Sequence, residues 1–159
     1  MAIAPTTGAK VYIGPTTAAS TASAYAALAY KEIKNVETIG GFGDTASVIE
    51  FTSLGDARVR KRKGVRNAGD MTITVANDPL DQGQRAVVAA EATEFPYAFK
   101  VVLADGADSN DTDSTFYFHA LVGGVPLSDL SANEIVKRAF SLLIDSPIIE
   151  VPSTAVSGS

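Results

Sequence analysis

The sequence predicts a mainly β protein, folded as a sandwich or a barrel. Short segments with apolar residues at alternate positions recur along the chain, and turns rich in glycine, proline or aspartate separate them. The hydrophobic fraction is 46% and the charged fraction 19%, so residues 1–159 can bury a core as one domain. Both fractions exclude a chain that is mainly disordered.

The expected strands are spread over the whole chain. The clearest covers residues 71–75, where threonine alternates with apolar residues in the pattern of a half-buried strand. Residues 16–29 are small and polar, and they predict either a loop or a marginal alanine-rich helix. The other expected strands cover residues 10–13, 31–39, 47–51, 97–103, 116–122, 140–144 and 147–151.

One helix is expected between these strands, over residues 80–92. Asp78 is a suitable N-cap, and Pro79 suits the first helical position because a missing N–H costs nothing there. Gly83 weakens the prediction by about 1 kcal/mol relative to alanine. The helix should end before Pro96.

Composition narrows the class of protein further. Cysteine is absent, which excludes disulfides and thiol chemistry. No apolar run reaches the roughly 18–20 residues that span a membrane, and the start of the chain lacks a secretory signal, so we expect no membrane anchor. The net charge is −5, the opposite of the usual balance in a protein that grips DNA. The termini, residues 1–9 and 152–159, should be mobile or become ordered on assembly.

Candidate catalytic and ligand-binding motifs fail on particular residues. The single histidine, His119, lies in an expected strand without a nucleophile motif, so a structural or surface role is favoured. Residues 41–46 imitate a dinucleotide fingerprint but lead into a strand, which favours a turn or bulge. The acidic run of residues 105–113 departs from a calcium loop at Thr112, Asp113 and His119. We therefore expect no enzyme activity, cofactor or metal.

The most unusual feature is a basic segment within the connection over residues 52–69. This connection is longer than the usual hairpin loop of about 2–5 residues. Three interpretations stay open: a solvated loop, a nucleic-acid patch without interleaved aromatic residues, or an arm that docks on another subunit. An arm needs an acidic receiver, and identical subunits carrying both would associate head to tail. The candidate contact residues are Arg58, Arg60, Lys61, Arg62, Lys63 and Arg66 on the arm, with Asp105, Asp108, Asp111 and Asp113 on the receiver.

The order of these segments resembles the major tail tube proteins of long-tailed bacteriophages. The resemblance runs from about residue 10 to residue 151. Its most distinctive pieces are Gly69-Asp70 before a strand, Asp78-Pro79 opening the helix, and Phe116-Tyr117-Phe118. It implies a β-sandwich or barrel with one helix packed on it and a long inter-strand loop that reaches a neighbouring subunit.

The resemblance also implies a structural role in the virion. Subunits made in the host cytoplasm would form hexameric rings, stacked into a tube around a tape-measure protein and ended by terminator and tail-tip proteins. DNA would pass through the lumen without specific binding, because carboxylates repel phosphate. Two alternatives are the inner tube of a contractile tail or secretion system and a nucleic-acid-binding β-barrel that uses residues 58–66.

Overall fold

The computed structural model describes residues 8–55, 57–105, 113–128 and 130–153, which contain eleven strands and two helices. In chain order they are β1 (Lys10–Ile13), α1 (Ala22–Ala26), β2 (Lys31–Ile33), β3 (Val36–Ile39), β4 (Thr45–Phe51), β5 (Arg60–Asn67), β6 (Asp70–Ala76), α2 (Gln82–Glu91), β7 (Tyr97–Val102), β8 (Thr115–Gly124), β9 (Leu127–Ser128), β10 (Lys137–Ile144) and β11 (Ile149–Val151).

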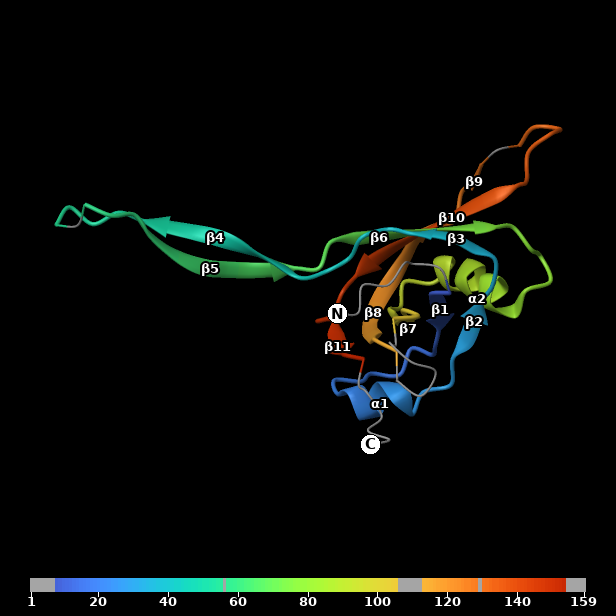
Figure 1. Cartoon of the computed structure of the whole chain (residues 1–159), viewed down its shortest axis with the longest axis horizontal. Helices are drawn as coiled ribbons and strands as arrows, with labels where there is room; N and C mark the ends of the chain where they lie inside the picture. The colour runs from blue at the N-terminus through green and yellow to red at the C-terminus, as the bar shows by residue number, and fades with distance from the viewer. Residues whose placement is uncertain (1–7, 56, 106–112, 129, 154–159) are drawn as a thin grey trace.

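Nine strands form one antiparallel sheet that curls on itself to make the body (Figure 1). The main path runs β2-β1-β7-β8-β10-β6-β3, with β11 beside β8 and β9 beside β10. The two ends of this path, β2 and β3, are consecutive in the chain and only Lys34 and Asn35 separate them. Asn35 has a φ of 61°, a left-handed conformation that asparagine tolerates better than most residues. One bent segment therefore supplies both ends of the sheet and draws them together.

Helix α2 packs against this bend, and three of its residues explain how. Asp81 caps the helix by accepting from the backbone N–H of Gln84, and the same carboxylate oxygen accepts from the N–H of Lys34. The Gln84 amide donates to the carbonyl oxygens of Lys34 and Ala76. A Cβ at Gly83 would collide with the carbonyl of Glu32, so glycine here allows the helix to approach β2.

The core lies inside the curled sheet. Aromatic and branched side chains from β6, β7, β8 and β10 meet there without exposure to solvent, and the rings of Phe99 and Phe118 stack with centroids 5.9 Å apart. Val87 and Ala90 of α2 are buried in the same cluster. The alternating pattern that predicted these strands is therefore a pattern of inward-facing residues.

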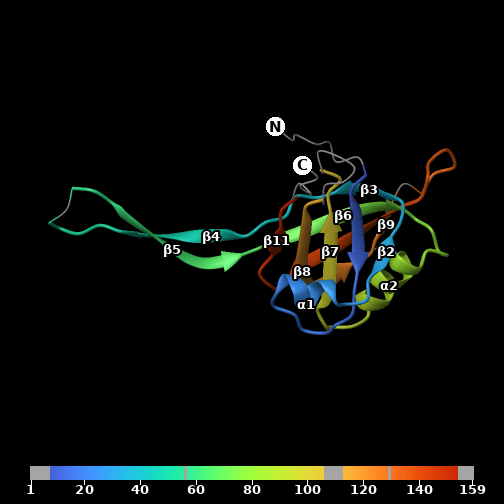
Figure 2. The same ribbon diagram turned by 60° about the horizontal axis from the view of Figure 1, so that its bottom comes forward.

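The outer face of β7 and β8 is also covered, by α1 and the residues before it (Figure 2). Tyr25 of α1 stacks on Tyr117 at 5.5 Å, and its hydroxyl lies 2.7 Å from Nδ1 of His119. Nε2 of His119 donates to the carbonyl of Thr17 at 2.9 Å, because a carbonyl oxygen can only accept. Both ring nitrogens thus tie the N-terminal segment to the sheet, in agreement with the structural role expected for His119.

The structure confirms a mainly β fold with one prominent helix, and corrects several details. The N-cap is Asp81 and not Asp78, whose carboxylate instead accepts from Leu80, so Pro79 precedes the helix. The expected long connection is a strand from Arg60 to Asn67, paired with β4. Residues 31–39 form two strands separated by the bend, residues 22–26 are helical, and β9 was not anticipated.

Gly83→Ala should destabilise the body strongly, because the new methyl group would force α2 away from β2. We expect a loss of about 1–3 kcal/mol in the free energy of unfolding, the usual cost of overpacking. Urea denaturation followed by circular dichroism measures this loss. Gly41→Ala is the matched control, because a Cβ there meets nothing within 4 Å. Equal stability of the two variants would show that the close approach of α2 carries no energetic weight.

Candidate assembly surfaces

A two-stranded arm stands apart from the body. We define the arm as residues 45–67, which comprise β4, β5 and the residues that join them. β4 and β5 pair with each other, from Thr45 opposite Asn67 to Phe51 opposite Arg60, and form a separate sheet. Figures 1 and 2 both show this ribbon extending well away from one side of the body. At about 3.4 Å per residue, β4 alone reaches roughly 24 Å.

The two faces of the arm differ in their side chains. Residues directly opposite each other on antiparallel strands point to the same face. On one face, which we call the Ile49 face, each apolar residue lies beside an arginine. The opposite face is richer in lysine. The pairs are Ile49 with Arg62 and Phe51 with Arg60 on the Ile49 face, and Val48 with Lys63 and Glu50 with Lys61 on the other.

Gly64 supports this assignment of faces. The register shifts between Ala46 and Val48, as at a β-bulge. A Cβ added to Gly64 would collide with the Ser47 hydroxyl and lie 3.2 Å from Cγ1 of Ile49. The side chains of Ser47 and Ile49 therefore lie over Gly64 on one face of the ribbon.

The apolar side chains of the arm are exposed to solvent. Ile49 is 55% exposed, Phe51 62% and Val48 63%, and Leu54, Val59 and Val65 are exposed as well. An isolated two-stranded ribbon is at best marginally stable in water. A row of exposed apolar residues on such a ribbon is typical of an interaction surface.

Charge is strongly divided between the arm and the rest of the chain. The arm holds six lysine and arginine residues against two carboxylates, a net charge of +4. The remaining residues hold seven cations against sixteen carboxylates, a net charge of −9, which together with the arm gives the chain total of −5. Within the described part of the chain, Lys61, Arg62 and Lys63 make no ion pair; one between Lys137 and Glu37, at 3.0 Å, lies on the body. A second copy of the body thus has the charge that complements the arm.

The predicted acidic receiver is only partly described. Asp108 and Asp111 lie outside the described residues, and Asp113 is exposed two residues before β8. Asp105 is engaged within its own turn, because its Oδ1 accepts from the backbone N–H of Ser114 at 2.7 Å. Hydrogen bonds from the side chain and the backbone of Ser114 hold the pKa of Asp105 below its ordinary value. Asp105 and Asp113 belong to the body, and the basic residues lie on the arm that extends away from it, so the predicted contact would join two chains.

A second projection was missed by the sequence analysis. β9 and the residues that lead from it to β10 extend from the body as a short hairpin (Figure 1), which we define as residues 127–136, residue 129 lying outside the described residues. Leu130 is 71% exposed and Ile135 is 70% exposed, and Leu127 is exposed beside them. The sequence signal was four large apolar residues, Leu127, Leu130, Ile135 and Val136, in a stretch otherwise rich in serine, asparagine and acids, which resembles an ordinary loop.

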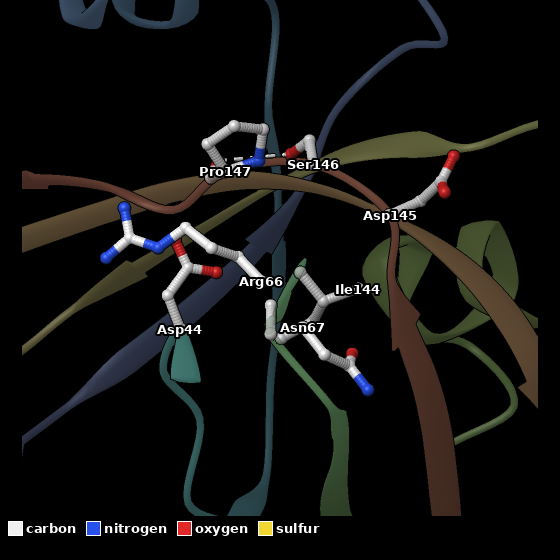
Figure 3. A pocket seen from close by; sticks show the side chains of 8 residues that line it. Asp44, Arg66, Asn67, Ile144, Asp145, Ser146 and Pro147 are labelled. Carbon is white, nitrogen blue, oxygen red and sulfur yellow. Dashed lines mark hydrogen bonds between the residues drawn. The ribbon is translucent and has the colours of Figure 1, made fainter. Parts of the chain in front are cut away.

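A recess of about 370 Å³ lies where the arm joins the body (Figure 3). Asp44 and Arg66 line one side, while Ile144 and Asp145 line the other. Asp44, Arg66 and Asp145 are exposed, and the recess brings together no buried polar groups that would hold a ligand. It is a hollow at the base of the arm, and it offers no catalytic arrangement.

Other candidate sites gain no support from the geometry. The imitated fingerprint, residues 41–46, runs from the connection after β3 into β4 and does not open a helix, which a dinucleotide site would require. Among the described residues, no three histidine, aspartate or glutamate side chains are placed to share a metal ion. In the same part of the chain, no helix combines the length and the apolar character needed to cross a membrane.

The comparison with protein families decides the identity. The model of the phage tail tube protein family (TTP) matches residues 6–147, which is most of the chain. The chain belongs to this family. As a tail tube protein it is a structural component of a phage tail and not an enzyme. No curated protein is similar enough in sequence to be matched.

Solved structures share the fold of this tail tube protein at low sequence identity. A chain of the anti-feeding prophage baseplate superposes with a TM-score of 0.69 at 15% identity, covering 96% of this chain and 97% of that one. A chain of the SPP1 tail tube gives 0.60 at 16% identity, covering 93% and 80%. The Hcp protein gives 0.51 at 9% identity, covering 91% and 98%. At these identities the likeness concerns the fold alone.

Replacing Ile49 and Phe51 together by serine should leave the body as stable as before, because both side chains project into solvent. We expect a change within about 0.5 kcal/mol in the free energy of unfolding of the monomer. Phe99→Ala, which empties a fully buried position, should cost about 3–5 kcal/mol. Urea denaturation at low protein concentration measures both. A comparable loss in the arm variant would mean that the arm packs against its own body.

Asp105→Asn should destabilise the protein at neutral pH and have no effect in acid. The folded-state pKa of Asp105 is lowered, so its carboxylate stabilises the fold above the ordinary value of 3.8, and that contribution disappears as the pH falls through the folded pKa. Urea denaturation of both proteins from pH 7 down to pH 2 measures the difference. Ser114→Ala keeps the backbone donor and should retain part of the effect. A difference that did not depend on pH would contradict the role of the charge.

Proposed function

We propose that this tail tube protein assembles into hexameric rings, which stack into the hollow tube through which phage DNA is delivered. The fold, shared with a chain of the SPP1 tail tube over 93% of this sequence, supports the tube. The baseplate structure that contains another similar chain is described as six-fold symmetrised, and we extend that symmetry to this chain as part of the proposal. The subunits would be made in the host cytoplasm and then incorporated into the virion tail.

The observation that carries this proposal is the arm. Its strands gain no burial from the body, yet they present apolar side chains and a net charge of +4. Burying a side chain such as Ile49 or Phe51 against a neighbour contributes about 1.5–3 kcal/mol. A surface of this kind is stable in water as an extended ribbon only when another chain covers it.

The receiver of the arm would be the acidic body of a neighbouring subunit. We keep Asp105, Asp108, Asp111 and Asp113 as one candidate receiver, with Arg58, Arg60, Lys61, Arg62, Lys63 and Arg66 as the arm contacts. Such a head-to-tail contact repeats from copy to copy, and it closes into a ring when the rotation between copies allows.

The negative charge of the body also suits a channel for DNA. With a net charge of −9 outside the arm, a lumen wall built from the body would repel phosphate, so DNA would slide through without specific binding. We further propose that the tube encloses a tape-measure protein and ends in terminator and tail-tip proteins.

A second candidate is the inner tube of a contractile tail or injection system. The TM-scores favour it slightly, at 0.69 for a chain of an extracellular contractile injection system against 0.60 for the SPP1 chain. A non-contractile tube needs no outer sheath. Sedimentation of preformed tubes with sheath proteins encoded near the gene would separate the two candidates, since only an inner tube should bind a sheath.

Reversing two charges on the arm, Arg62→Glu with Lys63→Glu, should abolish tube formation. Negative-stain microscopy of the purified protein should show rings or tubes for the unmodified chain and none for this variant. Assembly of the unmodified protein should also weaken as salt is raised, because the Debye length is only about 10 Å at 0.1 M. The variant should unfold at the same temperature as the unmodified monomer.

The matched control is Lys10→Glu with Lys31→Glu, which changes the net charge equally on exposed positions of the body. Tubes from both variants would contradict a role for the arm. A gel shift with double-stranded DNA at physiological salt tests the remaining alternative. Tight binding that the arm variant loses, without any tubes from the unmodified protein, would favour a nucleic-acid-binding barrel.

A further inference from the structure

The hairpin of residues 127–136 has the surface character that the Ile49 face of the arm requires in a partner. Leu130 and Ile135 project from it, more than two thirds exposed, and Glu134 lies between them in sequence and is exposed too. The Ile49 face pairs each apolar side chain with an arginine, Ile49 with Arg62 and Phe51 with Arg60. One surface is therefore apolar and acidic, and the other is apolar and basic.

The two surfaces lie on opposite sides of the body. Figure 1 shows the arm leaving at one end of the longest axis and the hairpin projecting toward the other end. The turned view in Figure 2 keeps them on opposite sides. Unlike patches on opposite sides of a subunit are the arrangement for head-to-tail association, in which the patch of one copy meets the other patch of the next.

The hairpin also suits this role better than the acidic turn near β8. Asp105, which precedes that segment, already accepts from the backbone N–H of Ser114. The hairpin adds exposed aliphatic side chains, which an acidic turn alone does not offer. The hairpin pairs with β10 over only two residues, and its aliphatic side chains remain exposed to water in the single chain. Covering them with a partner would remove this apolar surface from water.

We propose that the hairpin of residues 127–136 receives the Ile49 face of the arm of a second copy of this chain. Leu130 and Ile135 would cover Ile49 and Phe51, while Glu134 would face Arg62. This inference rests on the proposed self-assembly and specifies which surface of the neighbour the arm occupies.

Cysteine cross-linking tests the contact, because the chain has no cysteine of its own. The variants Ile49→Cys and Ile135→Cys are prepared separately, mixed under assembly conditions and treated with a short bifunctional maleimide. The expected result is a heterodimer band. Val48→Cys is the matched control for the arm, since residue 48 is as exposed as residue 49 but faces the other way. It should cross-link to Ile135→Cys several-fold less.

Two further cysteines identify a wrong receiver. Leu80→Cys is exposed elsewhere on the body, and Asp113→Cys reports on the acidic turn. A cross-link from Ile49→Cys that is stronger to either of these than to Ile135→Cys overturns the proposal. The charge pair gives an independent readout: Arg62→Glu should reduce assembly several-fold, and adding Glu134→Arg should restore it. The proposed contact is overturned if Glu134→Arg does not restore assembly of the Arg62→Glu variant and residues 49 and 135 also fail to cross-link.

The unmodified protein separates the two levels of the proposal. Tubes in the microscope without the cross-link between residues 49 and 135 would leave the proposed function standing and reject the hairpin as receiver. An unmodified chain that stays monomeric at high concentration would reject both the tube and the hairpin contact, because that contact exists only between copies.

Discussion

The bend between β2 and β3 is the constraint on which the rest of the structure depends. Because β2 and β3 are the two ends of the sheet path and only two residues separate them, the sheet has to curl on itself. The backbone groups at the bend are satisfied by Asp81 and Gln84 of the α2 region, whose side chains bond to both the N–H and the carbonyl of Lys34. These part-buried hydrogen bonds tie the bend to α2, although the side chains of Lys34 and Asn35 themselves are exposed. Helix α2 therefore stabilises the curl as well as adding to the core.

The arrangement of the curled sheet explains why β4 and β5 form a separate sheet outside the body. Along the curled sheet path, β1, β7, β8, β10 and β6 each have a strand on both sides along part of their length. The chain leaves the body after β3 and re-enters it at β6, and these two strands pair with each other. Between them, β4 and β5 pair with each other and form a sheet separate from the body. The arm thus follows from the topology of the body, and its exposed apolar side chains follow from the lack of a second layer.

The elements that could be predicted from the sequence are those whose buried residues recur at a regular spacing within the element itself. β6 alternates threonine with buried Met71, Ile73 and Val75, and the sequence shows that period directly. β5 could not be predicted, because its residues include five basic ones and no alternation; it is a strand only because β4 pairs with it. Asp81 displaced Asp78 as the N-cap for a similar reason, since Asp81 also bonds to Lys34, 47 residues away in the chain. A pattern of neighbouring residues cannot predict contacts between residues that are far apart in the chain.

Of the two candidate contact surfaces, the arm could be predicted from the sequence in part and the hairpin could not. The basic residues of the arm stood out in the sequence by their density alone, and the structure added that the ribbon also carries Ile49 and Phe51 on one face. The hairpin at residues 127–136 had no such signal, because exposure of Leu130 and Ile135 depends on where the hairpin points. Since the arm carries +4 and the rest of the chain −9, two copies attract most strongly when the arm of one lies on the body of the other. Arm-to-arm and body-to-body contacts bring like charges together, so the charge division favours contact between the arm of one copy and the body of another. The arm and the hairpin lie on opposite sides of the body, and that placement favours a directional, repeating contact.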